Sequence, residues 1–198
     1  PSQLPAGPDS PQEKSGVWAP PGQYTVELQV NGHRYRQPLL LKADPRVQVS
    51  TAAMQREFEL ARKVEEASAR AARASAEAGK LLKALDALPQ TTLHTQVEDL
   101  MAKAQDLSGV VMHPDPRNAM GTPPRRTDSL RALSMNLAKL EQAVDGADAD
   151  PSQDAKASYA ELSTTLDATI EAWQRLKRSD LADLNARLKA VGAKPIAL

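Results

Sequence analysis

The chain has 198 residues, of which 41% are hydrophobic and 3% aromatic, and its 25 basic and 25 acidic side chains give a formal net charge of zero. The chain has no excess of basic residues of the kind that binds nucleic acid, so we expect no nucleic-acid partner. No apolar run approaches the 18 or so residues of a membrane span, so we expect none. The absence of cysteine excludes disulfide bonds and thiolate chemistry, and it leaves the compartment open.

Residues 1–22 are rich in Pro, Ser and Gly, which is typical of a loop or linker. Trp18 is the exception, because a large aromatic side chain is seldom placed in a free tail. We expect Trp18 to pack on the hairpin or on a helix that follows.

Residues 23–46 predict a β-hairpin. Apolar and polar residues alternate from Tyr24 to Val30, and Asn31-Gly32 supplies a two-residue turn with positive φ. The expected pairs are Val30 with His33, Leu28 with Tyr35, Val26 with Gln37, and Tyr24 with Leu39. One face is then mostly apolar, and Pro38 marks the second strand as an edge because it has no N–H.

A two-stranded hairpin is only marginally stable in water. Either the helices cover its apolar face, or residues upstream of Pro1 complete its sheet. The chain also lacks an initiator Met, and we therefore expect a C-terminal piece of a longer protein.

Residues 50–198 predict a helical bundle. The first helix begins at Ser50 or Thr51 and ends at Leu88-Pro89. Its apolar residues follow a coiled-coil spacing: Leu60, Val64, Ala67, Ala71, Ala74, Ala78, Leu81, Leu85 and Leu88. The alanines in the middle favour close packing of a neighbouring helix within the bundle; the alternative is an exposed surface for another chain.

Three further long helices and a short one follow. Their apolar residues run from Leu93 to Val111, from Leu130 to Val144, from Tyr159 to Leu176, and from Leu181 to Leu188. We expect the third helix to begin at Thr127 or Asp128 and to end with Gly146 in the left-handed C′ position. The fourth has Asp150 as N-cap, Pro151 at N1 and Gln153 at N3, and the last spans Ser179 to Val191. The fold class is mainly α, an antiparallel up-down bundle of about four helices.

Candidate sites are few. His33, His94 and His113 lie far apart, the pairs Glu65-Glu66 and Glu98-Asp99 suit solvated helix faces, and the run Asp145, Asp148, Asp150 and Asp154 lacks the closing Glu of a calcium loop. We therefore expect no catalytic residue, metal or cofactor. Arg117, Arg125 and Arg126 form a small basic patch that could bind an acidic partner, although a charged loop is the simpler interpretation.

The segment Ala19 to Arg46, APPGQYTVELQVNGHRYRQPLLLKADPR, resembles a bacterial pattern that closes an Ig-like domain near the C-terminus of secreted sortilin-like BNR/Asp-box β-propeller proteins of glycosyl-hydrolase type. The stretches VDGADADPS (144–152) and DLADLNARLKAVGAKPI (180–196) resemble the end of the same proteins. The Asp-box signature and the propeller are absent here, so no catalytic residue is carried over.

The resemblance implies an extracellular or periplasmic, non-catalytic accessory region that docks, caps or dimerises. Its expected partners are the upstream β-propeller and Ig-like part of the same protein, or a second copy of the chain. Two alternatives stay open. The parent could be a glycoside hydrolase to whose active site Arg117, Arg125 and Arg126 contribute, or the chain could be a self-standing interaction module that recruits a helix through the alanine stripe.

Overall fold

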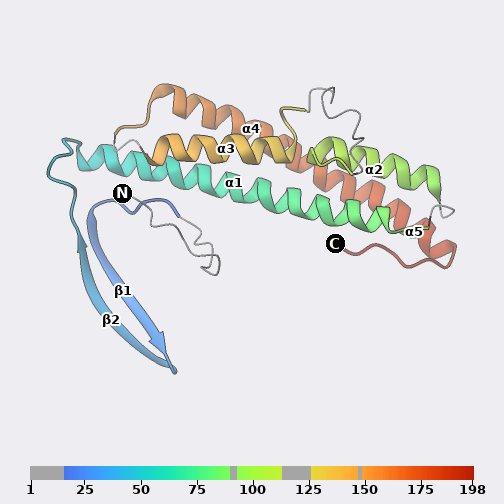
Figure 1. The fold of residues 1–198 in the computed structure, drawn as a ribbon, viewed down its shortest axis with the longest axis horizontal. Coiled ribbons are helices and arrows are strands. Elements are labelled where there is room, and N and C mark those ends of the chain that lie inside the picture. Colours follow the sequence, from blue (N-terminus) through green and yellow to red (C-terminus); the bar gives the residue numbers. More distant parts are fainter. Residues whose placement is uncertain (1–15, 90–92, 113–125, 147–148) are drawn as a thin grey trace.

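The structure, a computed structural model, describes residues 16–89, 93–112, 126–146 and 149–198. Figure 1 shows a helical bundle with a hairpin projecting from one end. The elements are β1 (Gly22–Val30), β2 (His33–Leu41), α1 (Thr51–Asp86), α2 (His94–Ser108), α3 (Leu130–Asp145), α4 (Gln153–Leu176), the π-helical η2 (Lys177–Leu181) and α5 (Ala182–Ala190). The predicted class, a mainly helical bundle preceded by a hairpin, is confirmed.

The hairpin has the predicted register. β1 and β2 pair antiparallel with Val30 opposite His33, Leu28 opposite Tyr35, Val26 opposite Gln37 and Tyr24 opposite Leu39. The turn residues Asn31 and Gly32 both have positive φ, at 47° and 79°, as a turn that matches the twist of the two strands requires.

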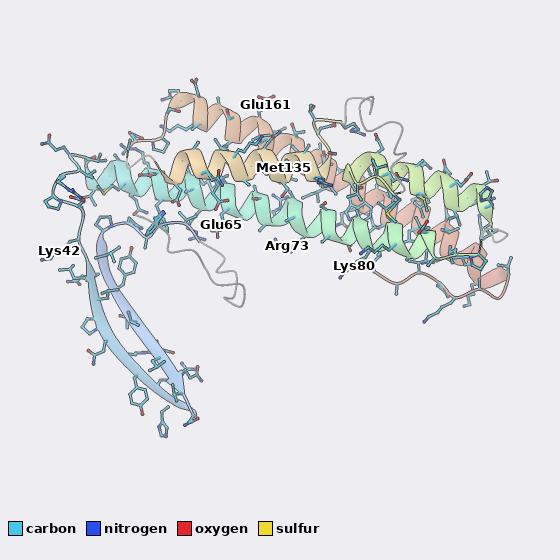
Figure 2. The ribbon with its side chains drawn as sticks, in the orientation of Figure 1. Lys42, Glu65, Arg73, Lys80, Met135 and Glu161 are labelled. Atoms are coloured by element: carbon cyan, nitrogen blue, oxygen red, sulfur yellow. The ribbon has the colours of Figure 1, made fainter. Side chains whose placement is uncertain are left out.

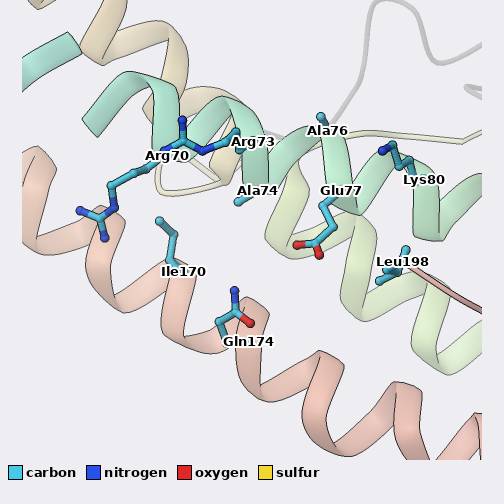
Figure 3. Close-up of a pocket in the computed structure, with 9 residues that line it drawn as sticks. All are labelled: Arg70, Arg73, Ala74, Ala76, Glu77, Lys80, Ile170, Gln174 and Leu198. Carbon is cyan, nitrogen blue, oxygen red and sulfur yellow. The ribbon is translucent and has the colours of Figure 1, made fainter. Parts of the chain in front are cut away.

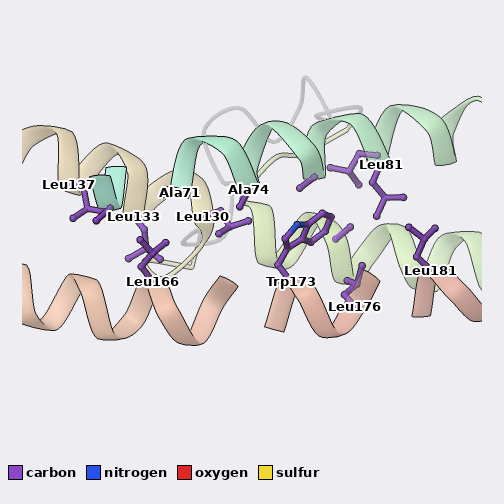
Figure 4. Packing of buried hydrophobic residues seen from close by; sticks show 14 of the residues in the cluster. Ala71, Ala74, Leu81, Leu130, Leu133, Leu137, Leu166, Trp173, Leu176 and Leu181 are labelled. Carbon is purple, nitrogen blue, oxygen red and sulfur yellow. The ribbon is translucent and has the colours of Figure 1, made fainter. Parts of the chain in front are cut away.

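Helix α1 organises the bundle. Its 36 residues span about 54 Å at 1.5 Å per residue, and its predicted apolar stripe is buried from Leu60 to Leu85. The alanines let the other helices approach closely, and Trp173 of α4 fills the centre of the core (Figure 4).

Helices α2 and α3 lie end to end along α1 (Figure 1). Both run opposite to α1, and α4 then returns along them. Helices α2 and α3 therefore share one column along α1, and α4 packs against α1, α2 and α3. At their junction Gly109, the left-handed residue that ends α2, packs against Ser129, the N-cap of α3.

The last predicted helix is not separate from the one before it. α4 continues through η2 into α5 without a break in the chain of helical turns. Leu181, Leu184 and Leu188 are buried as predicted, and Gly192 follows with a φ of 76°.

Serine side chains cap three helices. Ser50 accepts a hydrogen bond from the Ala53 N–H, as predicted for the start of α1. At α3 the cap is Ser129 rather than Thr127 or Asp128, and at α4 it is Ser152 rather than Asp150. These two predictions were wrong because nearby Asp and Thr residues qualify equally by type, and only the hydrogen bonds decide between them.

Three further predictions were wrong. Gly146 has a φ of −98°, so it ends α3 without a left-handed turn. Val111 lies beyond the end of α2 and is exposed. The Trp18 side chain is 73% exposed instead of packed; its backbone N–H donates to the Asp145 carboxylate at 3.2 Å, which fixes the strand entry without burying the ring.

Among the helices in the described ranges, none combines the length and the apolar character that crossing a bilayer demands.

Candidate functional site

Most of the large apolar side chains that are exposed in the described residues belong to the hairpin. We define the hairpin apolar face as the side chains of Tyr24, Val26, Leu28, Val30, Tyr35 and Leu39, which the register places on one side of the two strands. Leu28 is 57% exposed and Tyr35 59%. Figures 1 and 2 show the strands running away from the helices, so the bundle does not cover this face.

The opposite face of the hairpin is polar. Arg36 donates from Nε to Glu27 Oε2 at 2.6 Å, and Arg34 approaches the same carboxylate at 3.7 Å. Pro38 and Leu40 are the apolar exceptions on this side. The hairpin therefore has one apolar and one polar face, the pattern of antiparallel strands that pack on a core on one side and meet solvent on the other.

The predicted basic patch is only partly described. Arg117 and Arg125 lie outside the described residues. Arg126 donates to Asp128 at 2.7 Å and also contacts Asp106 of α2. These contacts raise the pKa of Arg126, and the contact with Asp128 has a larger effect than the contact with Asp106. The charge of Arg126 is thus already paired with two carboxylates. Arg126 thereby links the end of α2 to the start of α3.

An open groove of about 540 Å³ lies between α1 and α4 (Figure 3). Its lining residues are Arg70, Arg73, Ala74, Ala76, Glu77, Lys80, Ile170, Gln174 and Leu198. Arg70 bridges to Asp167 across the groove at 2.6 Å. No sequence pattern marks this groove, because its residues come from three distant segments that share no motif.

Among the described residues that line this groove, Glu77 is the one with a carboxylate side chain, and this carboxylate is already engaged. It accepts hydrogen bonds from Trp173 Nε1 and from Lys177 Nζ, each at 2.8 Å. Burial raises the pKa of Glu77, but these two donors and the charge of Lys177 outweigh burial and lower the pKa below its usual value. A glycosidase site needs a second carboxylate facing the first, and the groove's described lining does not supply it.

A smaller hollow of about 150 Å³ lies between α2 and the η2–α5 segment. Of the three carboxylates among its described lining residues, Asp180 and Asp99 contact Lys103, at 2.7 and 2.8 Å, and these contacts raise the pKa of Lys103. The predicted carboxylate pair Glu98-Asp99 is therefore split, since Asp99 faces Lys103 while Glu98 lies 3.4 Å from His94.

The other candidates from the sequence do not come together. Glu66 pairs with Arg62 along the exposed side of α1. Asp150 pairs with Arg56 at 2.6 Å, which draws it away from any shared cation site. His113 and Asp148 lie outside the described residues, and within those residues no group of three potential metal ligands occurs.

The alanine stripe of α1 is covered by the bundle itself. Ala67, Ala71, Ala74 and Ala78 are between 0% and 8% exposed. The predicted close packing within the bundle is confirmed, and the hypothesis that this stripe recruits a helix of another chain is wrong.

The motifs that carry the family resemblance form structural joints. Asp44 accepts from both the N–H and the guanidinium of Arg46 in the DPR turn. In the last motif the Asn185 amide accepts from the Ile196 N–H at 2.8 Å and donates to the Ile196 carbonyl at 2.9 Å. Asn185 thereby ties the segment after Gly192 back onto α5.

Comparison with protein-family models, with curated proteins and with solved structures finds no match to this chain. The hairpin apolar face and the groove between α1 and α4 are thus interpreted from their own chemistry.

Proposed function

We propose that this chain is a non-catalytic accessory region in which the hairpin completes a β-sheet built by another part of the same protein, and the bundle forms a stiff body that docks on or caps that part. The observation that carries the proposal is the exposure of the hairpin apolar face. An isolated hairpin is marginal in water, whereas a larger sandwich would bury this face.

The resemblance of residues 19–46, 144–152 and 180–196 to the end of sortilin-like β-propeller proteins supports the same proposal. Under this proposal the other part of the protein is an Ig-like domain behind a propeller, in a secreted bacterial protein. An extracellular or periplasmic location belongs to this proposal as well.

The hydrolase alternative receives less support. The Arg126 guanidinium is matched by two carboxylates, and the one carboxylate of the α1–α4 groove is matched by Lys177. A sugar carboxylate would have to displace the contacts of Arg126 before it could bind there.

A matched pair of substitutions tests the proposal in the full product of the gene that encodes this chain. Leu28→Asp places a charge on the hairpin apolar face, and Gln29→Asp places the same charge on the polar face one residue away. If the apolar face is covered, Leu28→Asp lowers the unfolding free energy of the sheet by about 3 kcal/mol, because burying an unpaired charge is costly, while Gln29→Asp changes it by about 0.5 kcal/mol or less.

The 198-residue chain is the reference, since both positions are exposed in it and both substitutions are expected to be nearly neutral. Amide exchange in the hairpin, followed as a function of denaturant concentration, measures the unfolding free energy of each variant in both proteins. Equal, small effects of the two variants in the full gene product, or a gene product no larger than 21.3 kDa, would overturn the proposal.

A further inference from the structure

The turn determines which backbone groups of the hairpin face outward. In a two-residue hairpin the flanking residues, here Val30 and His33, exchange both hydrogen bonds, and bonded pairs then alternate with non-bonded pairs along the strands. Glu27 and Arg36 form a non-bonded pair in this register. The outward-facing N–H and C=O groups are those of Gln23, Thr25, Glu27 and Gln29 on β1 and of Arg34, Arg36, Pro38 and Leu40 on β2.

The two outer edges are not equivalent. Pro38, opposite Thr25, occupies an outward position of β2 and has no N–H to donate. A strand added beside β2 would lose a hydrogen bond in its central part. The outer edge of β1 has no such interruption, since every outward residue there keeps its N–H.

The size of the hairpin argues against a second copy as the covering partner. Nine residues per strand at about 3.3 Å, and two strands about 4.8 Å apart, give a footprint of roughly 300 Å². Stable interfaces between separate proteins bury about 800 Å² on each partner. A part of the same polypeptide needs less contact, because its association is intramolecular.

The face also indicates what kind of surface covers it. The hairpin apolar face contains no Asp, Glu, Lys or Arg, whereas Glu27, Arg34 and Arg36 all lie on the other side. The hairpin apolar face is suited to packing against the apolar inner face of a second sheet, and the polar face is suited to contact with water.

We propose that β1 is an inner strand and β2 the outermost strand of a larger sheet: a third strand of the same polypeptide pairs with the outer edge of β1, and an apolar sheet of that polypeptide covers the hairpin apolar face. This inference rests on the proposed function and adds the strand order to it. It assigns β2, with Pro38, to the exposed edge.

Two proline substitutions at cross-strand partners test the strand order in the full gene product. Glu27→Pro removes an outward N–H from β1, and Arg36→Pro removes one from β2. Both break the Arg36–Glu27 side-chain hydrogen bond, and Glu27→Pro also removes the longer contact from Arg34. Neither removes a backbone hydrogen bond within the hairpin, so each is a control for the other. We measure amide exchange at Val26, Leu28 and Tyr35, whose N–H groups bond across the hairpin.

With a third strand on β1, Glu27→Pro accelerates exchange at these amides about tenfold relative to Arg36→Pro, as expected for one lost interstrand hydrogen bond. In the 198-residue chain the two variants should behave alike. A larger effect of Arg36→Pro, or equal effects in the full product, would overturn the strand order.

The two proposals fail separately. If Leu28→Asp is damaging in the full product while Glu27→Pro and Arg36→Pro are equivalent, the sheet is covered and only the strand order is wrong. If Leu28→Asp is harmless as well, the proposed function itself is wrong.

Discussion

At the scale of single residues, Gly109 leaves the least room for a side chain among the described glycines. Its φ is 70°, and a Cβ added there would lie 2.5 Å from Ser129 Oγ and 2.9 Å from Ser129 Cβ. Ser129 is buried and caps α3, so it cannot move aside without losing that cap. Gly109 therefore allows α2 to end directly against the start of α3.

We predict that Gly109→Ala lowers the unfolding free energy by about 3 kcal/mol, from the left-handed backbone, the steric overlap and the weakened cap together. Gly79→Ala is the matched control, because Gly79 lies within α1 and an added Cβ meets nothing within 4 Å. That change should stabilise the protein by about 0.5–1 kcal/mol, since alanine is the better helix former. Urea denaturation measures both, and a Gly109→Ala variant as stable as the wild type would contradict the account.

The residue-scale prediction of the hairpin turn was right because its segment offers one suitable dipeptide. Asn31-Gly32 was the only suitable turn in its segment, and both residues have the expected positive φ. The caps of α3 and α4 were misplaced because Thr127, Asp128 and Ser129, like Asp150 and Ser152, are all good cap residues by type. Hydrogen bonds that depend on the packing of the helix decide among them.

At the scale of elements, the spacing of buried residues accounts for the π-helical segment η2. From Leu162 to Leu188 the inward residues are Leu162, Leu166, Thr169, Trp173, Leu176, Leu181, Leu184 and Leu188. The steps are three or four residues except for the five from Leu176 to Leu181. In a regular α-helix one extra residue would rotate all later side chains by about 100° around the helix axis. The wider π turn accommodates the extra residue, so Leu181, Leu184 and Leu188 stay on the inward face.

We predict that deleting Arg178, an exposed residue of η2, converts the segment to a regular α-helix. The step from Leu176 to Leu181 becomes four, and all inward residues stay on one face. The unfolding free energy should change by about 1 kcal/mol or less, because no buried group is lost. A crystal structure would show whether the π turn has gone.

Deleting Ala168 is the control. It is also exposed and lies within α4, but its loss shortens the step from Leu166 to Thr169 to two residues. Trp173, which is fully buried, then rotates away from the core, and we expect a loss of about 4 kcal/mol or more. If removing Arg178 is as damaging as removing Ala168, the π segment has another cause.

The helices themselves were largely predictable, since their apolar periodicity is strong and the buried residues follow it. The sequence did not predict that α2 and α3 share one column, because the length of each helix, and not its periodicity, determines how many fit along α1. It also separated α5 from α4, since a five-residue step looks like the end of one helix when read without the structure.

At the scale of the whole molecule, the hairpin and the bundle have different relations to solvent. The bundle buries its apolar residues within itself, with Leu81, Leu137 and Trp173 at 0% exposure. The hairpin leaves its apolar face open. Of the two expectations from the sequence, helices covering the hairpin or a sheet completed elsewhere, the described structure contradicts the first, and the second is the basis of our proposal.

The hairpin apolar face was predictable from the sequence, whereas the other candidate sites were not. Alternation along residues 23–41 identifies the apolar face of the hairpin, because neighbours in a strand point to opposite sides. No such local pattern marks the groove between α1 and α4, whose residues meet only after folding. The arginine patch was a weaker guide, since sequence proximity does not show that Arg126 is held by Asp106 of another helix.

Whether the hairpin is completed by another part of the protein is tested by hydrogen–deuterium exchange of the hairpin amides, measured in the 198-residue chain and in the full product of its gene. If the hairpin belongs to a larger sheet, Val26, Leu28 and Tyr35 exchange about a hundredfold faster than the buried residues of α1 in the 198-residue chain, and the full product slows them to the rates of its folded core. Hairpin amides that exchange equally fast in both proteins, or that are as protected as α1 in the 198-residue chain alone, would contradict the proposal.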